Sequence, residues 1–344
     1  MRLDRANRSF LAFVSVASLF GATVLCGAIG GVLVPLSLAR MSHGGLAGLW
    51  SDPGSLPALL LFFVLIAVGL GLGTRALVQQ AVASRTLSCR VSALATAAPE
   101  ALAQTARQTG LAGRVVLVDA ADSFSFVYGL MTPRVVVSRG LLERATGEEL
   151  RAVLEHEGYH VRNIDPLKAA IVRVFSEALF FIPALDSLRA RYVAGRELAA
   201  DRRAVALCGR RPLAGALLKV VRGPDWSEQA GAAEISSPEL LSVRIIQLET
   251  GFEPKPEALD AERVVLSLGC VTLFAVVFLV SVSRLGGASA LYHATGTGLI
   301  SATWLNTVTC AVPFVSAGLA MYWLLAWRAR RPLPVSARCE DCLP

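Results

Sequence analysis

At residues 156–160 the chain reads His-Glu-Gly-Tyr-His, and at residues 197–201 it reads Glu-Leu-Ala-Ala-Asp. Positions four apart share one face of a helix, so His156 and His160 can bind one ion together. Glu157 lies beside them, where it can take a proton from water at that ion. This is the H-E-x-x-H pattern of zinc proteases, and it predicts a helix that carries a hydrolytic metal site.

The composition indicates a membrane protein. The apolar fraction is 54% and the charged fraction is 17%, whereas soluble domains have about 25% charged residues. Many of the basic residues behind the net charge of +7 flank long apolar segments, so we expect them to orient a membrane protein and expect no direct nucleic-acid binding. Four segments reach the roughly 20 residues that a membrane-spanning helix needs: 9–39, 53–74, 264–283 and 299–327.

The charges also predict the topology. Basic residues precede the first apolar segment and follow the second and the fourth. The positive-inside rule then places both termini and the central region in the cytoplasm of a multi-pass cell-membrane protein, which we expect to be bacterial. We predict two transmembrane helices in 1–78, a cytoplasmic zinc metalloprotease domain in 79–262, two further transmembrane helices in 263–328 and a short cytoplasmic tail in 329–344.

The third metal ligand is predicted by elimination. A catalytic zinc site takes three protein ligands and one water. The chain has four histidines, and the topology places the other two, His43 and His293, across the membrane from the motif. The third ligand is therefore a carboxylate or a thiol, and Glu197 is the best candidate. Asp201 lies one turn further on the same face, where it can hydrogen-bond a ligand histidine and fix its tautomer.

The central region is expected to fold as α+β, with a helix over 76–109 and then three short strands. The strands are predicted at 115–118, 124–127 and 135–137. Glu197 and Asp201 lie on a predicted helix over 187–207, and a short amphipathic helix is expected over 238–250. The apolar stretch 169–185 is too short and too charged for a confident span, so we expect a core or membrane-grazing helix there.

The motif helix has predicted ends. Thr146 is a good N-cap residue, and Glu149 three positions later completes a capping box. Pro166 disfavours helical geometry in the residue before it, so the helix should end before Pro166. We expect Asp165 to cap the helix that follows, with a contact to a metal ligand as the alternative.

The predicted chemistry is peptide hydrolysis with a Zn²⁺ cofactor, although nitrogen and oxygen ligands also bind other divalent ions. Zinc lowers the pKa of its water toward ~7, and Glu157 takes the proton and delivers it to the leaving amine. The donor that stabilises the oxyanion is left open, with Tyr192 and the arginines near it as candidates. An exposed strand edge within 115–137 could bind an extended substrate as an additional strand.

Several stretches resemble the beta-lactam-sensing antirepressor peptidases, a BlaR/MecR-like family of membrane zinc metallopeptidases. The similar stretches are 124–129, 133–137, 140–142, 148–154, 165–167, 180–183 and 196–201, together with the motif. The related HtpX and CAAX prenyl proteases share the motif, the later glutamate and something like residues 244–248. The resemblance covers about 115–250. It implies a gluzincin fold with zinc ligands His156, His160 and Glu197, and with Glu157 as the base.

Three functions fit these observations. The first is an integral membrane zinc endopeptidase that acts at the cytoplasmic face on a protein or peptide substrate, in regulatory proteolysis of a transcriptional repressor or similar target. About 17 residues follow the last apolar segment, so we expect no extracellular penicillin-binding sensor. The second is an HtpX-like quality-control protease for membrane proteins. The third is a non-catalytic membrane adaptor with a vestigial metal site, which the four intact motif residues argue against. The lipid bilayer is an expected partner in all three, and the oligomeric state is left open.

Overall fold

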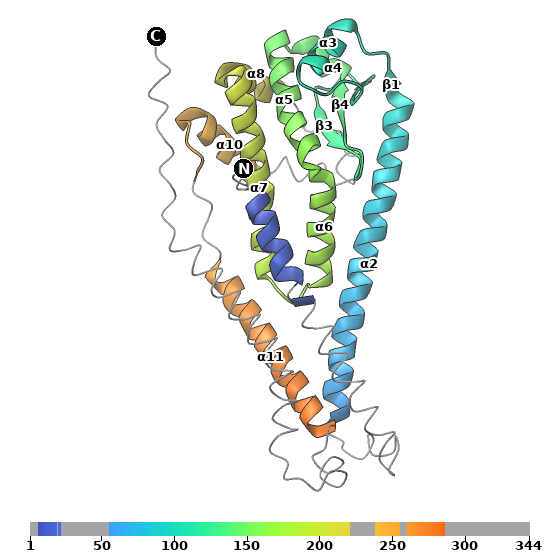
Figure 1. Cartoon of the computed structure of the whole chain (residues 1–344), viewed down its shortest axis with the longest axis vertical. Helices are drawn as coiled ribbons and strands as arrows, with labels where there is room; N and C mark the ends of the chain where they lie inside the picture. Colours follow the sequence, from blue (N-terminus) through green and yellow to red (C-terminus); the bar gives the residue numbers. More distant parts are fainter. Residues whose placement is uncertain (1–5, 19, 22–54, 221–237, 255–259, 286–344) are drawn as a thin grey trace. The chain divides into compact units, whose positions relative to one another are not determined.

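The computed structural model describes residues 6–18, 20–21, 55–220, 238–254 and 260–285. The chain divides into two units, and the larger one comprises residues up to Ala17 together with Phe63–Cys270. Within the described residues this unit is a mostly helical α+β fold with one small sheet (Figure 1), as predicted. Most of the first apolar segment, the whole fourth segment, the C-terminal tail, His43 and His293 lie outside the described residues.

The long helix α2 (Ser55–Leu94) extends well past the second apolar segment. Within the described part of the chain, one stretch is long and apolar enough to cross a membrane, and it is Phe63–Leu94 in this helix. Helix α11 (Ala261–Leu285) covers the third predicted span. The prediction of one helix over 76–109 is wrong, because the chain leaves α2 at Leu94.

The break after α2 has a local and a long-range contribution. Pro99 is the N-cap of helix α3 (Glu100–Gln108), and a proline disfavours helical geometry in the residue before it. The chain between the two helices forms the short strand β1 (Ala95–Thr96), which pairs antiparallel with β2 (Val115–Val118). The long-range pairing with β2 therefore replaces the predicted helical turn.

The sheet contains the three predicted strands and β1. Its order is β1-β2-β4-β3, with β3 spanning Ser125–Tyr128 and β4 spanning Arg134–Ser138. Strands β2 and β4 are parallel, and β3 pairs antiparallel with β4. Since β3 is last in this order, the described sheet presents it as an edge strand.

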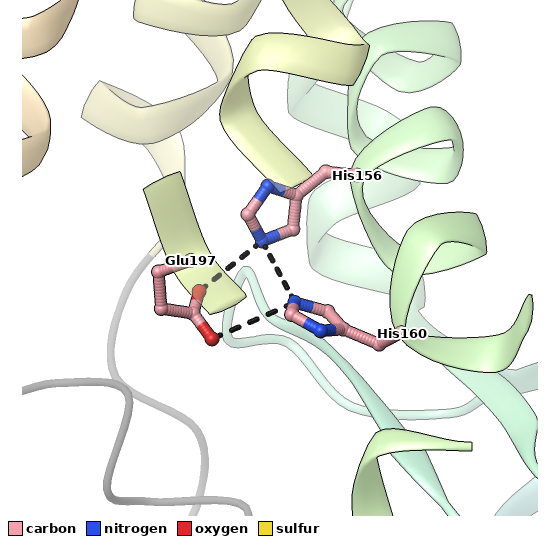
Figure 2. Close-up of side chains that lie close together, drawn as sticks. All are labelled: His156, His160 and Glu197. Atoms are coloured by element: carbon pink, nitrogen blue, oxygen red, sulfur yellow. Dashed lines mark hydrogen bonds and ion pairs between the residues drawn. The ribbon is translucent and has the colours of Figure 1, made fainter. Parts of the chain in front are cut away.

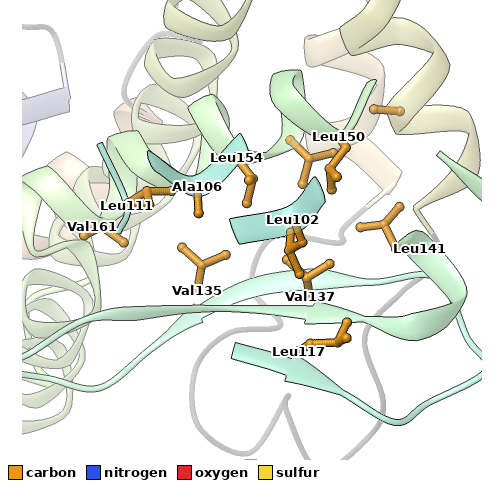
Figure 3. Close-up of a cluster of buried hydrophobic side chains, with 12 residues drawn as sticks. Leu102, Ala106, Leu111, Leu117, Val135, Val137, Leu141, Leu150, Leu154 and Val161 are labelled. Atoms are coloured by element: carbon orange, nitrogen blue, oxygen red, sulfur yellow. The ribbon is translucent and has the colours of Figure 1, made fainter. Parts of the chain in front are cut away.

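Helices cover both faces of the sheet. On one face, side chains from α3 and from the motif helix α5 (Gly147–Asn163) pack against apolar side chains of β2 and β4 (Figure 3). On the other face, Leu87 and Val91 of α2 pack with Phe124 and Phe126. The sheet therefore lies between the motif helix and the end of α2, which fixes β3 beside the motif.

The remaining helices of this unit follow the sheet in sequence. Helices α5 and α7 lie side by side (Figure 1), and α8 and α10 pack against α7. The predicted helices over 187–207 and 238–250 are confirmed. The expectation of one helix over 169–185 is wrong, because one helix ends at Ala178 and the next begins at Ala184. The elements are α4 (Arg139–Arg144), α6 (Asp165–Ala178), α7 (Ala184–Cys208), α8 (Arg210–Lys219) and α10 (Pro238–Thr250).

Candidate metal centre

The motif helix α5 begins with the predicted capping box. The backbone N–H of Glu149 donates to Thr146 Oγ1 at 3.3 Å, and the N–H of Thr146 donates to Glu149 Oε2 at 2.7 Å. Both contacts satisfy backbone donors that the first helical turn leaves unpaired. The helix ends at Asn163, before Pro166, as predicted. Two sequence-encoded boundaries therefore set where the motif histidines lie along the helix.

Three predicted ligands converge on one point (Figure 2). The Nε2 atoms of His156 and His160 are 3.3 Å apart, and Glu197 Oε2 lies 3.4 Å from His156 Nε2. Glu197 Oε1 lies 3.5 Å from His160 Nε2. One ligand atom from each residue fits within 4.8 Å of the others, and all three residues are buried. One metal ion can contact all three side chains at once.

The burial of Glu197 tests whether a metal fits. Its side chain is 0% exposed, and neither carboxylate oxygen has a hydrogen-bond partner. A buried ionised carboxylate is costly, so such groups are paired or coordinate a metal. Arg196 Nε pairs with Glu197 at 3.3 Å, and the histidine nitrogens on the other side leave it the geometry of a metal ligand. Two imidazoles and a carboxylate are a donor set of catalytic zinc sites. When bound, zinc would act as a Lewis acid on the scissile carbonyl and would acidify the attacking water.

Each ligand histidine also contacts a second carboxylate. His156 Nδ1 lies 2.9 Å from Asp201 Oδ1, and His160 Nδ1 lies 2.7 Å from Asp165 Oδ2. A carboxylate that accepts the Nδ1 proton fixes the tautomer and leaves Nε2 with its lone pair free for a metal. The structure therefore places Asp201 where it was predicted.

The prediction for Asp165 as a helix cap is wrong. The N-cap of α6 is Ile164, and this cap makes no side-chain hydrogen bond. Ile164 has φ 54° and ψ 42°, a left-handed conformation that β-branched residues rarely adopt. This turn points Asp165 back at His160. An acidic residue immediately after the end of the motif helix was the sequence signal for this contact.

Arg244 is a centre residue that the sequence reasoning did not assign. Its Nε donates to Asp201 Oδ2 at 2.7 Å, and its Nη2 donates to Asp201 Oδ1 at 2.8 Å. Its Nη1 also lies 3.8 Å from Glu197 Oε2. The arginine comes from α10, across 43 residues from Asp201. A contact over that separation leaves no periodic signal in the sequence.

The electrostatics of the centre favour ionised carboxylates. Burial acts to raise the pKa of Glu197, but His160, His156 and Arg196 outweigh it and hold that pKa far below its usual range. Burial likewise opposes the charged form of His156, yet the neighbouring carboxylates of Asp201 and Glu197 raise its pKa to about 9.

The predicted base, Glu157, lies at the edge of the sheet. Ser125 Oγ donates to Glu157 Oε1 at 2.8 Å, and Glu157 is 7% exposed. Alternating side chains in a strand point to opposite faces, so Phe124 and Phe126 face α2 while Ser125 faces α5. Ser125 was not predicted as a site residue, although the alternation at 124–127 already placed it on one face.

The candidates for the oxyanion donor lie deeper in the centre. The Arg196 guanidinium lies over the Tyr192 ring at 5.9 Å, and Arg196 Nε is 3.3 Å from Glu197 Oε1. Tyr192 is 1% exposed, and burial together with Asp165 raises its hydroxyl pKa above the usual range. The structure thus brings Arg196 to the carboxylate of Glu197 and buries Tyr192 against Arg196.

Two imidazoles and a carboxylate around one point, with a further carboxylate beside them, define the class as a metallopeptidase centre. The arrangement is held by α5, α7 and α10 and borders an edge strand. The chain belongs to the BlaR1 peptidase M56 family, whose sequence model matches residues 53–248, more than half of the chain. No solved structure matches it. Membership confirms the resemblance stated from the sequence, and the protein is a membrane-associated metallopeptidase.

Proposed function

We propose that this protein is an integral membrane zinc endopeptidase that hydrolyses peptide bonds at the cytoplasmic face, in regulatory cleavage of a repressor or similar target. The observation that carries the proposal is the carboxylate of Glu197. It is fully buried, neither oxygen has a hydrogen-bond partner, and its oxygens lie 3.4 Å and 3.5 Å from the Nε2 atoms of His156 and His160. A bound zinc ion accounts for all three features.

The proposal includes a gluzincin fold within a four-span membrane protein. A glutamate ligand on the helix after the H-E-x-x-H helix supports the gluzincin assignment. The apolar stretch in α2 and the helix over the third predicted span support the membrane part. The distribution of basic residues supports the cytoplasmic location of the catalytic domain.

A substrate is proposed to bind along β3. The strand pairs with β4 on one side, and an extended peptide could pair with its other side by main-chain hydrogen bonds. Ser125 of β3 hydrogen-bonds Glu157, so a peptide along this edge passes next to the base. The scissile bond would then lie between the edge strand and the histidine pair.

The proton steps are assigned to Glu157. Its carboxylate accepts a proton from the attacking water and returns it to the leaving amine, which is general base and then general acid catalysis. The Ser125 hydroxyl donates to one carboxylate oxygen and orients the other. Asp165 and Asp201 hold the histidine rings in place through Nδ1.

The test compares Glu157→Gln with the parent protein in detergent, using casein cleavage and self-cleavage as readouts. General base catalysis contributes about 10²–10⁴-fold, so we expect the activity of the variant to fall by a factor in that range while it retains zinc. Glu148→Gln is the matched control, because it makes the same change on an exposed position of α5. Equal cleavage by Glu157→Gln and by the parent would show that Glu157 is not the base. Inactivity of the parent protein would favour the alternative of a non-catalytic membrane adaptor.

A second experiment separates regulatory cleavage from quality control. Glu157→Gln is used as a bait that binds substrate without cutting it, and captured proteins are identified. Recovery of one preferred protein supports regulatory proteolysis. Recovery of many damaged or unfolded membrane proteins supports the HtpX-like alternative.

A further inference from the structure

We propose that the turn between α6 and α7, residues 179–183, inserts about one helical turn into the bilayer and that Phe180 contacts lipid acyl chains there. The inference rests on one part of the proposed function, namely that α2 and α11 span the membrane. The turn reads Leu-Phe-Phe-Ile-Pro and carries no charge. Its partner would be the leaflet on the side of the catalytic unit.

The first argument is the close contact of α6 with the apolar part of α2. A Cβ atom at Gly69 would lie 2.5 Å from the backbone oxygen of Ala178, and one at Gly73 would lie 2.9 Å from the Ala178 Cβ. Small residues four apart that let two backbones approach are typical of packing between membrane helices. The neighbouring side chains Val68 and Leu70 are 44% and 66% exposed. The end of α6 therefore lies beside a stretch suited to lipid.

The second argument is the direction of α6 along α2. Arg173 Nη2 donates to Gln79 Oε1 at 3.4 Å, whereas Ala178 lies at Gly69 and Gly73. The two helices are thus antiparallel, and α6 runs toward the apolar end of α2. The apolar segment ends at Thr74, so the turn after Ala178 lies on the membrane side of that boundary.

The third argument comes independently from α11. The backbone N–H of Ala184 donates to Ser267 Oγ at 2.8 Å, and this contact is buried. Arg263 is the last charged residue before the apolar segment 264–283. Four residues of helix separate Arg263 from Ser267, which is about 6 Å at a rise of 1.5 Å per residue. Both α2 and α11 therefore place the turn just inside the apolar boundary.

The side chains of the turn match that depth. Phe180 is 43% exposed. The nearest acidic residues on either side, Glu177 and Asp186, are also exposed, so deeper insertion would carry both carboxylates into hydrocarbon at high cost. Apolar faces of interfacial segments enter the bilayer by about 5–10 Å. An apolar tip between two exposed carboxylates fits this shallow position.

The insertion would also set the height of the metal centre. Helix α7 begins at Ala184 next to the turn and carries Glu197. Thirteen residues of helix separate the two, which is about 20 Å at 1.5 Å per residue. The catalytic centre would therefore be held at a fixed distance from the leaflet, and a substrate must present its scissile bond within that distance of the membrane.

The experiment uses the full chain in lipid nanodiscs with 4-trifluoromethyl-phenylalanine at one position, read by fluorine NMR. The positions are 180 in the turn, 70 in the apolar part of α2 and 131 in the loop before β4, where Met131 is 75% exposed. A phosphatidylcholine with a nitroxide near the top of its acyl chain probes the bilayer, and a gadolinium chelate probes water. A thermal unfolding midpoint equal to that of the parent shows for each labelled protein that the catalytic unit is folded.

We expect the lipid nitroxide to abolish the signals at 180 and 70 and to spare the signal at 131, with the chelate giving the reverse pattern. Signal loss at 180 from the chelate, with 70 still lost to the lipid probe, would overturn the insertion. Retention at 180 with both probes would also overturn it, because Phe180 would then be covered by protein. A signal at 70 that only the chelate removes would overturn the membrane assignment itself, whereas failure of zinc-dependent cleavage alone would leave the insertion standing.

Discussion

Each histidine of the candidate metal centre contacts a carboxylate through Nδ1. The distance is 2.9 Å from His156 to Asp201 and 2.7 Å from His160 to Asp165. We predict that Asp165→Ala lowers zinc affinity by about 10–100-fold, because His160 loses the group that fixes its ring orientation. Competition with a chromophoric chelator measures the affinity. Asp186→Ala is the control, since Asp186 is exposed and lies outside the centre. Equal zinc affinity in the two variants would show that the Asp165 contact does not support the metal.

Arg244 is the most distant residue in sequence that reaches the centre. Its two hydrogen bonds to Asp201 are made with both groups buried. Arg244→Met would leave Asp201 without its cation, and breaking a buried ion pair in this way costs about 3–5 kcal/mol. We predict a large drop in the thermal unfolding midpoint in detergent. The unfolding midpoint of Arg244→Lys should lie between those of the parent and of Arg244→Met. Lysine keeps the positive charge, but an ammonium group cannot donate the paired bonds of a guanidinium. A midpoint for Arg244→Met equal to that of the parent would contradict this role.

At the scale of elements, the ends of α5 follow from local chemistry. Thr146 accepts from Glu149 N–H and completes the capping box. We predict that Thr146→Ala lowers the free energy of unfolding by about 1 kcal/mol, while Thr146→Ser retains most of it because serine keeps the accepting oxygen. Chemical denaturation in a mild detergent measures both. If alanine and serine were equally stable at this position, the cap would contribute nothing.

The parts of the fold that could be predicted are those with a local cause. The three strands at 115–138, the capping box and the helix end before Pro166 each depend on residues within a few positions of one another. The short strand β1 was missed because its stability comes from pairing with β2 across the sheet. Propensity alone cannot anticipate such a pairing.

The residues of the candidate metal centre also fall into those with a local sequence signal and those placed by tertiary contacts. His156, Glu157 and His160 share one helix, so their spacing was enough to predict them. Glu197 was predicted from the ligand count, and Asp201 from its position one turn later on the same face. The contacts of Asp165, Ser125 and Arg244 depend on a left-handed residue, on the strand beside α5 and on the packing of α10. These are consequences of tertiary structure, and they had at most a weak signal in the sequence.

For the whole molecule, α2 joins a stretch apolar enough to cross a membrane to the unit that carries the candidate metal centre. The same helix contains the stretch apolar enough to cross a bilayer and, nearer its end, the side chains Leu87 and Val91 that cover one face of the sheet. The opposite face packs against the motif helix. A continuous path of packed elements therefore runs from the apolar part of α2 through the sheet to the motif helix.

The central claim is that His156, His160 and Glu197 bind one zinc ion, and zinc K-edge absorption on the purified full-length protein tests it most directly. We predict one zinc per chain with only nitrogen and oxygen neighbours at about 2.0–2.2 Å, including the scattering pattern of two imidazoles. Glu197→Gln should lose most of the metal. A sulfur neighbour at about 2.3 Å, or full zinc content with an unchanged spectrum in Glu197→Gln, would contradict the assignment.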